Sequence, residues 1–220
     1  MKNKLLIIQH ETSTPAGTTL EWAKNHSLEV VFWHPAREPQ PPSPEGLCGT
    51  VICGGGMDTF EEERFPWLKT EKAYLRQLLD RKIKIFGLCL GSQLLAEILG
   101  GRVYQHPGWE IGFIRLPRAG QEPLPVFHWH HCTFDLPAGA ELVLQGDYCR
   151  NQAFKVGDQV IATQFHPEAT EDWIRECAGD VKEKHQGNVQ STEEMLRDLP
   201  LQKVQQAWYF QQLDQLFLGK

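Results

Sequence analysis

Residues 83–99 read Ile83-Lys84-Ile85-Phe86-Gly87-Leu88-Cys89-Leu90-Gly91-Ser92-Gln93-Leu94-Leu95-Ala96-Glu97-Ile98-Leu99. Residues 83–86 predict a strand, and residues 92–99 predict a helix that Gly100-Gly101 ends. A strand that passes through Gly-x-Cys-x-Gly into a helix is the nucleophile-elbow pattern. The stretch therefore predicts a strand–turn–helix unit with Cys89 at the turn.

The glycines of this turn have a physical role. The turn is so sharp that side chains two residues on either side of Cys89 would clash, and Gly87 and Gly91 remove them. The helix N-terminus favours an anion, and the thiolate is the reactive form of cysteine. The amide of Leu90 is placed to bind an oxyanion. Taken alone, the motif fits a buried structural cysteine equally well.

The rest of the chain indicates the fold class. Strand-like runs at 4–9, 28–33 and 50–53 alternate with helix-like runs at 18–26 and 66–80. This alternation predicts an α/β fold with a mainly parallel central sheet flanked by helices. After residue 102 the pattern changes, and we expect short strands at 111–116, 125–128, 141–144, 152–156 and 159–164. Antiparallel strands are expected to extend the sheet in this region.

The end of the chain predicts helices. We expect one domain over residues 1–180 and a helical extension over residues 181–220 that packs on it. Ser191-Thr192-Glu193-Glu194 fits a capping box. Apolar residues recur at helical spacing in 201–218, which favours packing on the domain over a helix that binds a partner.

Composition narrows the function classes. The chain has 220 residues, 41% of them hydrophobic and 23% charged, with a net charge of -6. The charge does not indicate a nucleic-acid-binding surface, and no apolar run is long enough to span a membrane. The N-terminus reads as a first strand and not as a signal peptide. None of the six cysteines forms a Cys-x-x-Cys pair, so a zinc ribbon or thioredoxin-type site is not indicated. A core of this length needs no disulfides, so we expect reduced cysteines in a cytoplasmic protein.

A base and an acid for Cys89 occur in Gln164-Phe165-His166-Pro167-Glu168. In extended chain, residues two apart point to the same side, so His166 and Glu168 can interact. A carboxylate on one ring nitrogen fixes the histidine tautomer, and the other nitrogen can then exchange a proton with a thiol. A lone His-Pro-Glu would normally be a surface turn. Together with the elbow, it predicts a Cys-His-Glu catalytic triad.

Two further segments could contribute to a site. Gly54-Gly55-Gly56 follows a strand and can supply an oxyanion amide, although a flexible turn or a phosphate loop has the same composition. This segment lacks the Lys-Ser/Thr pair that a phosphate-binding loop requires. His128-Trp129-His130-His131-Cys132 is rich in potential zinc ligands. No second ligand pair at a recognised spacing accompanies it, so we expect a strand edge lining a pocket and no metal site.

Taken together, these motifs resemble those of the class I glutamine amidotransferases, in particular the amidotransferase domain of GMP synthase. The resemblance covers roughly residues 4–175. It is carried by 87–93 and 164–168 and extends through Gly54-Gly55-Gly56-Met57, Phe65-Pro66-Trp67-Leu68, Glu110-Ile111-Gly112, His128-Trp129-His130, Thr133-Phe134-Asp135-Leu136-Pro137 and Asn151-Gln152-Ala153-Phe154. It implies a flavodoxin-like class I glutamine amidotransferase fold.

The resemblance also implies roles. Cys89 attacks the side-chain amide of glutamine, and His166 and Glu168 complete the triad. The amides of Gly55 and Leu90 form the oxyanion hole, and Gln93 and His130 are expected at the substrate. A glutamyl thioester forms, ammonia leaves and water releases glutamate, with no cofactor required. The ammonia acceptor is expected to be either a separate synthase or a substrate bound directly.

Two positions depart from the family. It often has Gly-Gly-Pro where this chain has Gly54-Gly55-Gly56, which predicts a less ordered oxyanion loop. Related proteins often read His-Trp-His-Gly-Asp, whereas residues 131 and 132 here are His131 and Cys132, so a carboxylate near the pocket is expected to be missing.

Three other functions compete with a glutaminase. A γ-glutamyl hydrolase or peptidase would use the same triad on a larger γ-glutamyl compound. An α/β-hydrolase with a cysteine elbow would place its acid before the histidine, which His166-Pro167-Glu168 argues against. A non-catalytic binding module would not require an intact Cys-His-Glu set.

Overall fold

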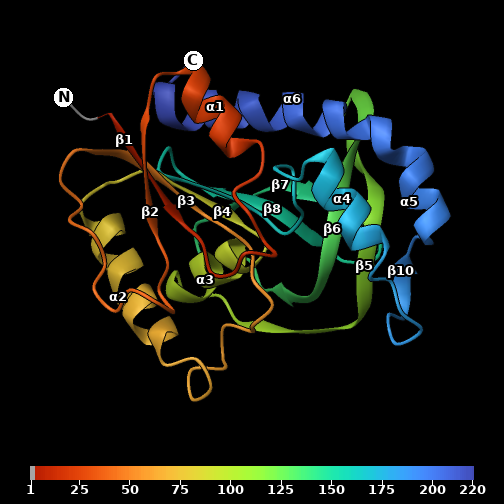
Figure 1. Cartoon of the computed structure of the whole chain (residues 1–220), viewed down its shortest axis with the longest axis horizontal. Helices are drawn as coiled ribbons and strands as arrows, with labels where there is room; N and C mark the ends of the chain where they lie inside the picture. Colours follow the sequence, from red (N-terminus) through yellow and green to blue (C-terminus); the bar gives the residue numbers. More distant parts are fainter. Residues whose placement is uncertain (1–2) are drawn as a thin grey trace.

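A computed structural model describes residues 3–220 and has a seven-stranded main sheet (Figure 1). The strand order is β2-β1-β3-β4-β9-β8-β7. The first five strands in this order run parallel, and β8 and β7 add antiparallel pairs at one edge. The strands are β1 (Lys4–Ile8), β2 (Glu29–Trp33), β3 (Leu47–Ile52), β4 (Ile85–Leu88), β7 (Glu141–Gln145), β8 (Asn151–Val156) and β9 (Val160–Thr163).

Helices cover both faces of this sheet (Figure 1). On one face α1 (Thr19–Asn25) and α6 (Gln202–Leu213) pack against apolar residues such as Leu5 and Phe86. On the other face lie α2 (Trp67–Asp80) and α3 (Leu90–Ile98). The predicted class, a mainly parallel sheet flanked by helices with added antiparallel strands, is confirmed.

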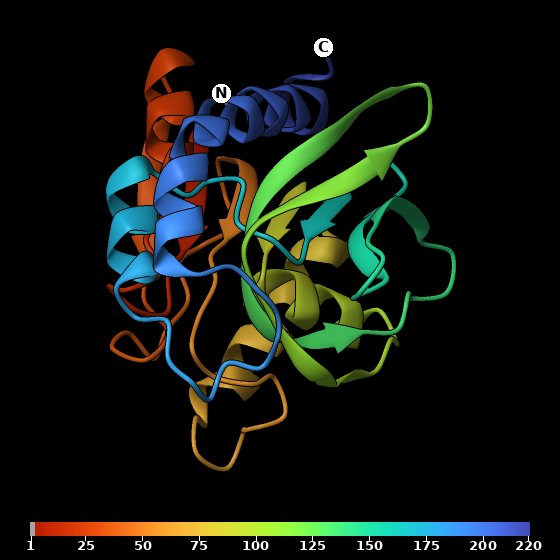
Figure 2. The ribbon, with the colours of Figure 1, turned by 90° about the vertical axis from the view of Figure 1, so that its right-hand side faces the viewer.

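The segment after α3 differs from the prediction of short strands. It forms two long antiparallel strands, β5 (Val103–Arg118) and β6 (Gln121–Phe134), which lie in a separate sheet of order β10-β5-β6 (Figure 2). Pro107, Pro117, Pro123 and Pro125 interrupt the strand pattern in the sequence, and proline normally argues against strand interiors. Register shifts between Gln105 and Glu110 and between Leu116 and Arg118 lie next to Pro107, Pro117 and Pro123, whereas Pro125 stays in register opposite Arg115.

Residues 181–220 are not wholly helical. β10 (Gly187–Val189) pairs with β5 before the chain enters α5 (Thr192–Asp198). The capping box is confirmed, because Glu194 N donates to Ser191 Oγ and Ser191 N donates to Glu194 Oε2. The remaining elements are α4 (Glu171–Ala178), the 3₁₀ turn η1 (Leu199–Leu201) and the π-helical turn η2 (Asp214–Leu218).

The last helix packs on the domain. Tyr209 and Leu213 are fully buried in the core beneath α1. The Tyr209 hydroxyl lies 2.8 Å from Thr19 Oγ1, and Trp22 Nε1 donates to Asp214 Oδ1 at 2.8 Å. These contacts account for the apolar spacing of the segment without a partner protein.

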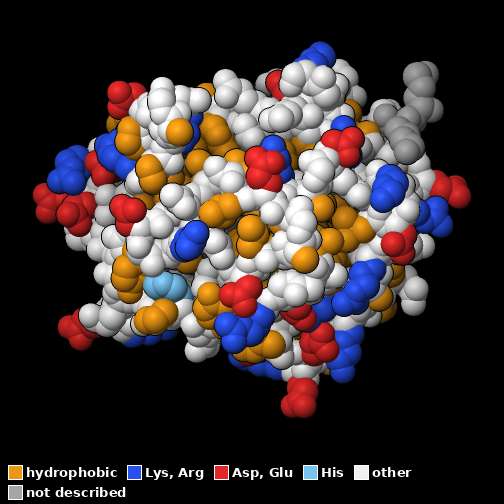
Figure 3. All heavy atoms as spheres, turned by 180° about the vertical axis from the view of Figure 1, so that it is seen from behind, with side chains coloured by type: hydrophobic (Ala, Val, Ile, Leu, Met, Phe, Trp, Pro, Cys, Tyr) orange, Lys and Arg blue, Asp and Glu red, His pale blue; other side chains and the backbone are white. Residues whose placement is uncertain are grey.

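The surface carries mixed charge. Acidic and basic side chains lie among apolar ones on the face in Figure 3. Across residues 3–220, the structure contains no helix with both the length and the apolar character needed to cross a bilayer.

The close approach of α3 to β3 requires a glycine. A Cβ added at Gly91 would lie 2.5 Å from the Ile52 carbonyl oxygen and 2.7 Å from Ile52 Cβ. A Cβ at Gly87 would lie 2.7 Å from the Gly91 carbonyl oxygen. Neither backbone atom can move without displacing the elbow.

We therefore expect Gly91→Ala to lower the free energy of unfolding by about 1–3 kcal/mol, as overpacking does in other cores. Gly179→Ala is the matched control, because its φ is -72° and its added Cβ would meet only Glu176 O at 3.4 Å. Urea denaturation of the two variants tests this. Equal midpoints for both variants would contradict the packing argument.

Candidate active site

Cys89 lies between β4 and α3 with φ 47° and ψ -104°, a conformation that L-residues rarely adopt. Its N–H donates to Thr163 O on β9 at 2.8 Å, and its own carbonyl accepts from Ser92 Oγ at 2.6 Å. Residue Cys89 is 6% exposed. It lies at the carboxyl end of β4, one of the parallel strands. The elbow therefore presents a nearly buried thiol at the edge where such sheets bind ligands.

His166 and Glu168 follow β9, the strand next to β4. His166 Nδ1 lies 2.8 Å from Glu168 Oε1, and both side chains are buried. A Cβ added at Gly54 would lie 2.8 Å from His166 Cε1 and 3.6 Å from Cys89 Cβ. Gly54 thus leaves open the space into which the imidazole and the Cys89 side chain converge. The structure brings all three predicted triad residues together.

The surroundings of His166 favour its charged form. Burial by itself lowers the pKa of His166, but the Glu168 carboxylate and Cys89, acting through charge and hydrogen bonds, outweigh it and raise the pKa to about 10. Trp173 lies edge-on to the imidazole, with ring centroids 5.0 Å apart, and limits its rotation. The imidazole is therefore held as an orientated proton donor beside the sulfur.

Two glutamines extend the contacts of the thiol. Gln164 Nε2 donates to Cys89 Sγ at 3.8 Å, and Gln164 Oε1 accepts from Gln93 Nε2 at 3.2 Å. Gln93 Nε2 also lies 3.4 Å from Cys132 O. The sequence motif contains Gln164, but its position toward the sulfur became visible only in the structure.

The Gly54-Gly55-Gly56 loop is fastened to the segment after β1. The Gly54 carbonyl accepts from His10 Nδ1 at 2.8 Å and from Thr14 Oγ1 at 3.0 Å. In a trans peptide the N–H points opposite to the C=O. Holding the Gly54 carbonyl therefore fixes the direction of the Gly55 N–H.

Two acidic residues strengthen this attachment. Glu71 lies 3.0 Å from His10 Nε2 and is fully buried with it. Burial lowers the pKa of His10, but Glu71 outweighs it and the pKa is raised. Glu11 Oε2 accepts from Gly56 N at 2.9 Å, a bond that proline could not make. The loop expected to be less ordered is thus tied by His10, Glu11 and Thr14.

A buried polar network lies beneath the β5–β6 hairpin. Glu110 Oε2 accepts from Gln152 Nε2 at 2.6 Å and lies 3.2 Å from His130 Nε2. Burial raises the pKa of Glu110, but His130, His128 and Gln152 outweigh it and lower the pKa to about 2. Burial lowers the pKa of His128 to about 3. An ionised Glu110 with neutral His128 fits these directions.

His130 lies beside the candidate pocket, but its ring nitrogens are both engaged. Nδ1 lies 3.1 Å from Cys132 O, while Nε2 faces Glu110. A substrate bond to a ring nitrogen would have to replace one of these contacts. His130 therefore joins the buried network to the pocket wall.

The Asp58 carboxylate lies beside residues 131 and 132, where the sequence predicts that a family carboxylate is missing. Cys132 Sγ donates to Asp58 Oδ1 at 3.1 Å, and His131 Nε2 lies 3.9 Å from the same oxygen. Burial and Asp58 raise the pKa of the Cys132 thiol, so it stays a neutral donor. Asp58 follows the glycine loop, so no local motif linked it to Cys132.

Two sets of side chains have the ligand spacing of a metal site. They are Asp58 with His131 and Cys132, and Glu110 with His128 and His130. Hydrogen bonds join Cys132 to Asp58 and His128 Nδ1 to His130 Nε2, whereas His128 Nε2 has no hydrogen-bond partner among the described residues. The expectation of no metal site stays a prediction.

Two cavities meet at Cys89. The first is lined by the glycine loop, Gln93, Trp109 and residues 129–132, with Asp58 at its wall. The second is lined by the other side of the glycine loop, His166, Trp173 and the end of α4. Cys89, Gly55, Gly56 and Trp129 line both. The thiol therefore has space on two sides.

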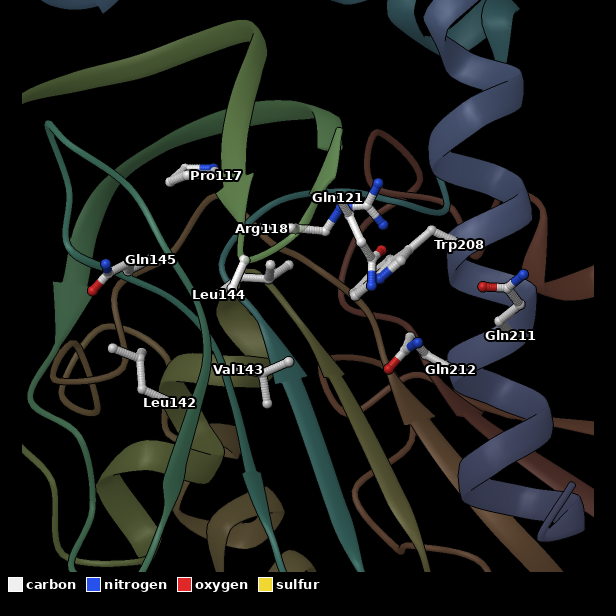
Figure 4. A pocket seen from close by; sticks show the side chains of 11 residues that line it. Pro117, Arg118, Gln121, Leu142, Val143, Leu144, Gln145, Trp208, Gln211 and Gln212 are labelled. Carbon is white, nitrogen blue, oxygen red and sulfur yellow. The ribbon is translucent and has the colours of Figure 1, made fainter. Parts of the chain in front are cut away.

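A larger hollow lies elsewhere, between β7, the β5–β6 turn and α6 (Figure 4). Its labelled side chains include Arg118, Val143, Trp208 and Gln212. None of the three predicted triad residues lines it. The chemistry-bearing residues are gathered at Cys89 instead.

The raised pKa of His166 makes a measurable prediction. Protonated His166 should stabilise the fold fully below its unfolded pKa of about 6.5, and this contribution should be lost as pH rises toward about 10. Glu168→Gln removes the carboxylate, so wild type should exceed it in unfolding free energy by a margin that narrows from pH 6.5 to 10. Chemical denaturation across this range tests the trend, and side-chain NMR of His166 tests its cause. A constant margin, or titration of wild-type His166 near 6.5, would contradict this assignment.

Comparisons with known proteins identify relatives over most of the chain. The family described as "Glutamine amidotransferase class-I" matches residues 22–173. A glutamine amidotransferase-like protein of Salmonella typhimurium is 28% identical over 94% of this chain and 91% of its own length. A glutamine-hydrolysing GMP synthase subunit of Ignicoccus hospitalis is 30% identical over 64% of this chain and 79% of its own length. Gamma-glutamyl peptidase 2 of Arabidopsis thaliana is 28% identical over 58% of this chain and 56% of its own length.

A solved structure agrees. A glutamine amidotransferase from Thermotoga maritima superposes with a TM-score of 0.89 at 27% identity, over 99% of both chains. The family match spans more than half of the sequence and includes the elbow, His166 and Glu168. The chain belongs to the class I glutamine amidotransferase family.

Proposed function

We propose that the protein hydrolyses the side-chain amide of glutamine, or of another γ-glutamyl compound, with Cys89 as nucleophile. The observation that supports this most is the buried His166, held between Glu168 at 2.8 Å and the Cys89 thiol. A cationic imidazole beside a sulfur at a helix N-terminus stabilises the thiolate needed for attack.

The reaction has two stages. Cys89 Sγ attacks the amide carbon, and the resulting tetrahedral intermediate collapses as the C–N bond breaks and the nitrogen takes the proton of His166. This leaves a γ-glutamyl thioester and neutral His166. His166 then takes a proton from water, the hydroxide attacks the thioester, and the C–S bond breaks to release glutamate. Glu168 acts on His166 alone and keeps Nε2 directed to the reacting atoms.

The oxyanion of both intermediates is proposed to bind the amides of Gly55 and Leu90. Leu90 is the first residue of α3, where an amide has no acceptor within the helix. The direction of the Gly55 amide is fixed because the Gly54 carbonyl accepts hydrogen bonds from His10 and Thr14. Two amides fixed before substrate arrives stabilise charge that develops only during the reaction.

The glutamyl group is proposed to occupy the cavity lined by Gln93, His130 and Asp58. Both hydrogen bonds of the Gln93 side chain are donated by its nitrogen, so its oxygen is the polar atom left for a substrate. The Asp58 carboxylate suits the α-ammonium of a glutamyl group.

Two uses of the released nitrogen follow from the relatives. Similarity to the GMP synthase subunit of Ignicoccus hospitalis supports a glutaminase that supplies ammonia to a separate synthase. Similarity to gamma-glutamyl peptidase 2, together with a second cavity beside His166, supports a γ-glutamyl hydrolase. Six free thiols support a cytoplasmic location.

Removal of the nucleophile tests the proposal. We expect Cys89→Ala to lower glutamate release from glutamine and from γ-glutamyl amides by a factor of about 10³ or more, because the variant lacks the attacking sulfur. Cys48→Ser is the matched control, since Cys48 lies at the far end of β3 from Cys89 and its thiol donates to Lys4 O. Turnover that survives Cys89→Ala would refute the assignment.

The fastening of the oxyanion loop is tested separately. We expect Thr14→Val to lower kcat about tenfold or more, because one of the two bonds that orientate the Gly54–Gly55 peptide is lost while the shape is kept. Its KM and its urea midpoint should change little. Thr12→Val serves as the control in the same loop. A fall in stability without a fall in kcat would show that Thr14 has only a structural role.

A further inference from the structure

The two cavities at Cys89 differ in the proton chemistry they can support. His166 lines the second cavity and does not line the first, whereas Gln93 and His130 line only the first. The group that gives a proton to the departing nitrogen must face that nitrogen. The second cavity is therefore the leaving-group side of the thiol.

The wall of this leaving-group cavity is acidic. Glu11, Glu176 and Asp180 line it, and its lining includes neither lysine nor arginine. The Glu11 carboxylate already accepts a hydrogen bond from Gly56 N. Among residues 3–220, neither the Glu176 nor the Asp180 side chain has a hydrogen-bond or ion-pair partner. Two carboxylates at the end of α4 are thus free to meet a cation.

The charges of these carboxylates act on the neighbouring Cys177 thiol. It lies between them in the sequence and also lines the cavity. Burial raises the pKa of Cys177, and the charges of Asp180 and Glu176 raise it further, to about 12. Negative potential therefore reaches into the cavity wall.

Aromatic rings complete the cavity. Trp129 and Trp173 both line it. The face of an indole attracts cations, and carboxylates beside aromatic rings are the usual surroundings of a bound ammonium group. An amine of this kind could extend past Trp173 from the reacting nitrogen at His166. Ammonia, the product from glutamine, would leave most of this space unused.

We propose that the protein accepts γ-glutamyl amides whose leaving amine carries a second, cationic nitrogen, as in a γ-glutamyl diamine. This rests on the proposed γ-glutamyl chemistry at Cys89. The Cys89 sulfur bonds to the γ-carbon, the C–N bond breaks, and the nitrogen leaves with the proton of His166. The distal ammonium, held by Glu176 and Asp180, takes no part in the bond changes. Water then hydrolyses the thioester to glutamate.

Three matched substrates test the proposal with the full chain: γ-glutamyl amides of 1,4-diaminobutane, n-pentylamine and 4-aminobutyrate. They place a cation, a methyl group and an anion at similar distances from the scissile bond. We expect kcat/KM to be about tenfold higher for the diamine than for pentylamine, and lowest for aminobutyrate, because two exposed ion pairs together have an effect of about this size. The preference should weaken at high salt.

Variants identify the source of the preference. Glu176→Gln combined with Asp180→Asn should bring the ratio of the diamine to the pentylamine substrate close to one. The matched control, Asp172→Asn with Glu183→Gln, removes the same charge from exposed positions outside the cavity and should keep the ratio.

The outcomes separate this proposal from the one it rests on. Cys89-dependent hydrolysis of glutamine or γ-glutamyl-pentylamine without a preference for the diamine would overturn the cationic leaving group alone. A preference that both double variants keep equally would also overturn it, since the charge would then act from elsewhere. Absence of any Cys89-dependent turnover would overturn the proposed function together with this inference.

Discussion

The hydrogen bond from Cys89 N to Thr163 O, 2.8 Å long, joins the end of β4 to the end of β9. It closes the parallel pairing of these strands at the point where one continues into the nucleophile and the other into His166. The backbone of Cys89 stays at φ 47° against an intrinsic cost of about 1–3 kcal/mol. The sheet that holds it also sets the distance from thiol to base, so the geometry of the site depends on this pairing.

The C-terminal segment supports the same arrangement from outside. Gln205 on α6 accepts from Phe127 N at 2.8 Å, and Phe127 O accepts from His166 N at 2.8 Å. Gln202 Nε2 donates to Ala169 O, just beyond Glu168. A helix that lies far from Cys89 in the sequence thus fixes β6, which accepts from His166 N, and the loop that carries His166. This gives the C-terminal helices a structural role that the sequence did not reveal.

Local pattern explains what could be predicted. The elbow, the parallel sheet and His166-Pro167-Glu168 depend on residues close together in the chain, where spacing and glycine placement are informative. The strands of the β5–β6 hairpin are longer than those that the sequence predicts, because their pairing is non-local and prolines obscure the strand pattern. Contacts such as Glu71 with His10, Asp58 with Cys132 and Gln152 with Glu110 join distant segments. No period or spacing in the sequence predicts them, and they orientate the site.

In the proposed mechanism, Cys89 carries the γ-glutamyl group between the two stages of hydrolysis. Acid quenching of the protein during turnover of a γ-glutamyl amide, followed by intact-mass and peptide mass spectrometry, tests this most directly. We predict one added glutamyl group, located on the peptide that contains Cys89 and removable by hydroxylamine. A glutamyl group found on another cysteine, or turnover by the wild-type protein that leaves no adduct on Cys89 at any quench time, would contradict the mechanism.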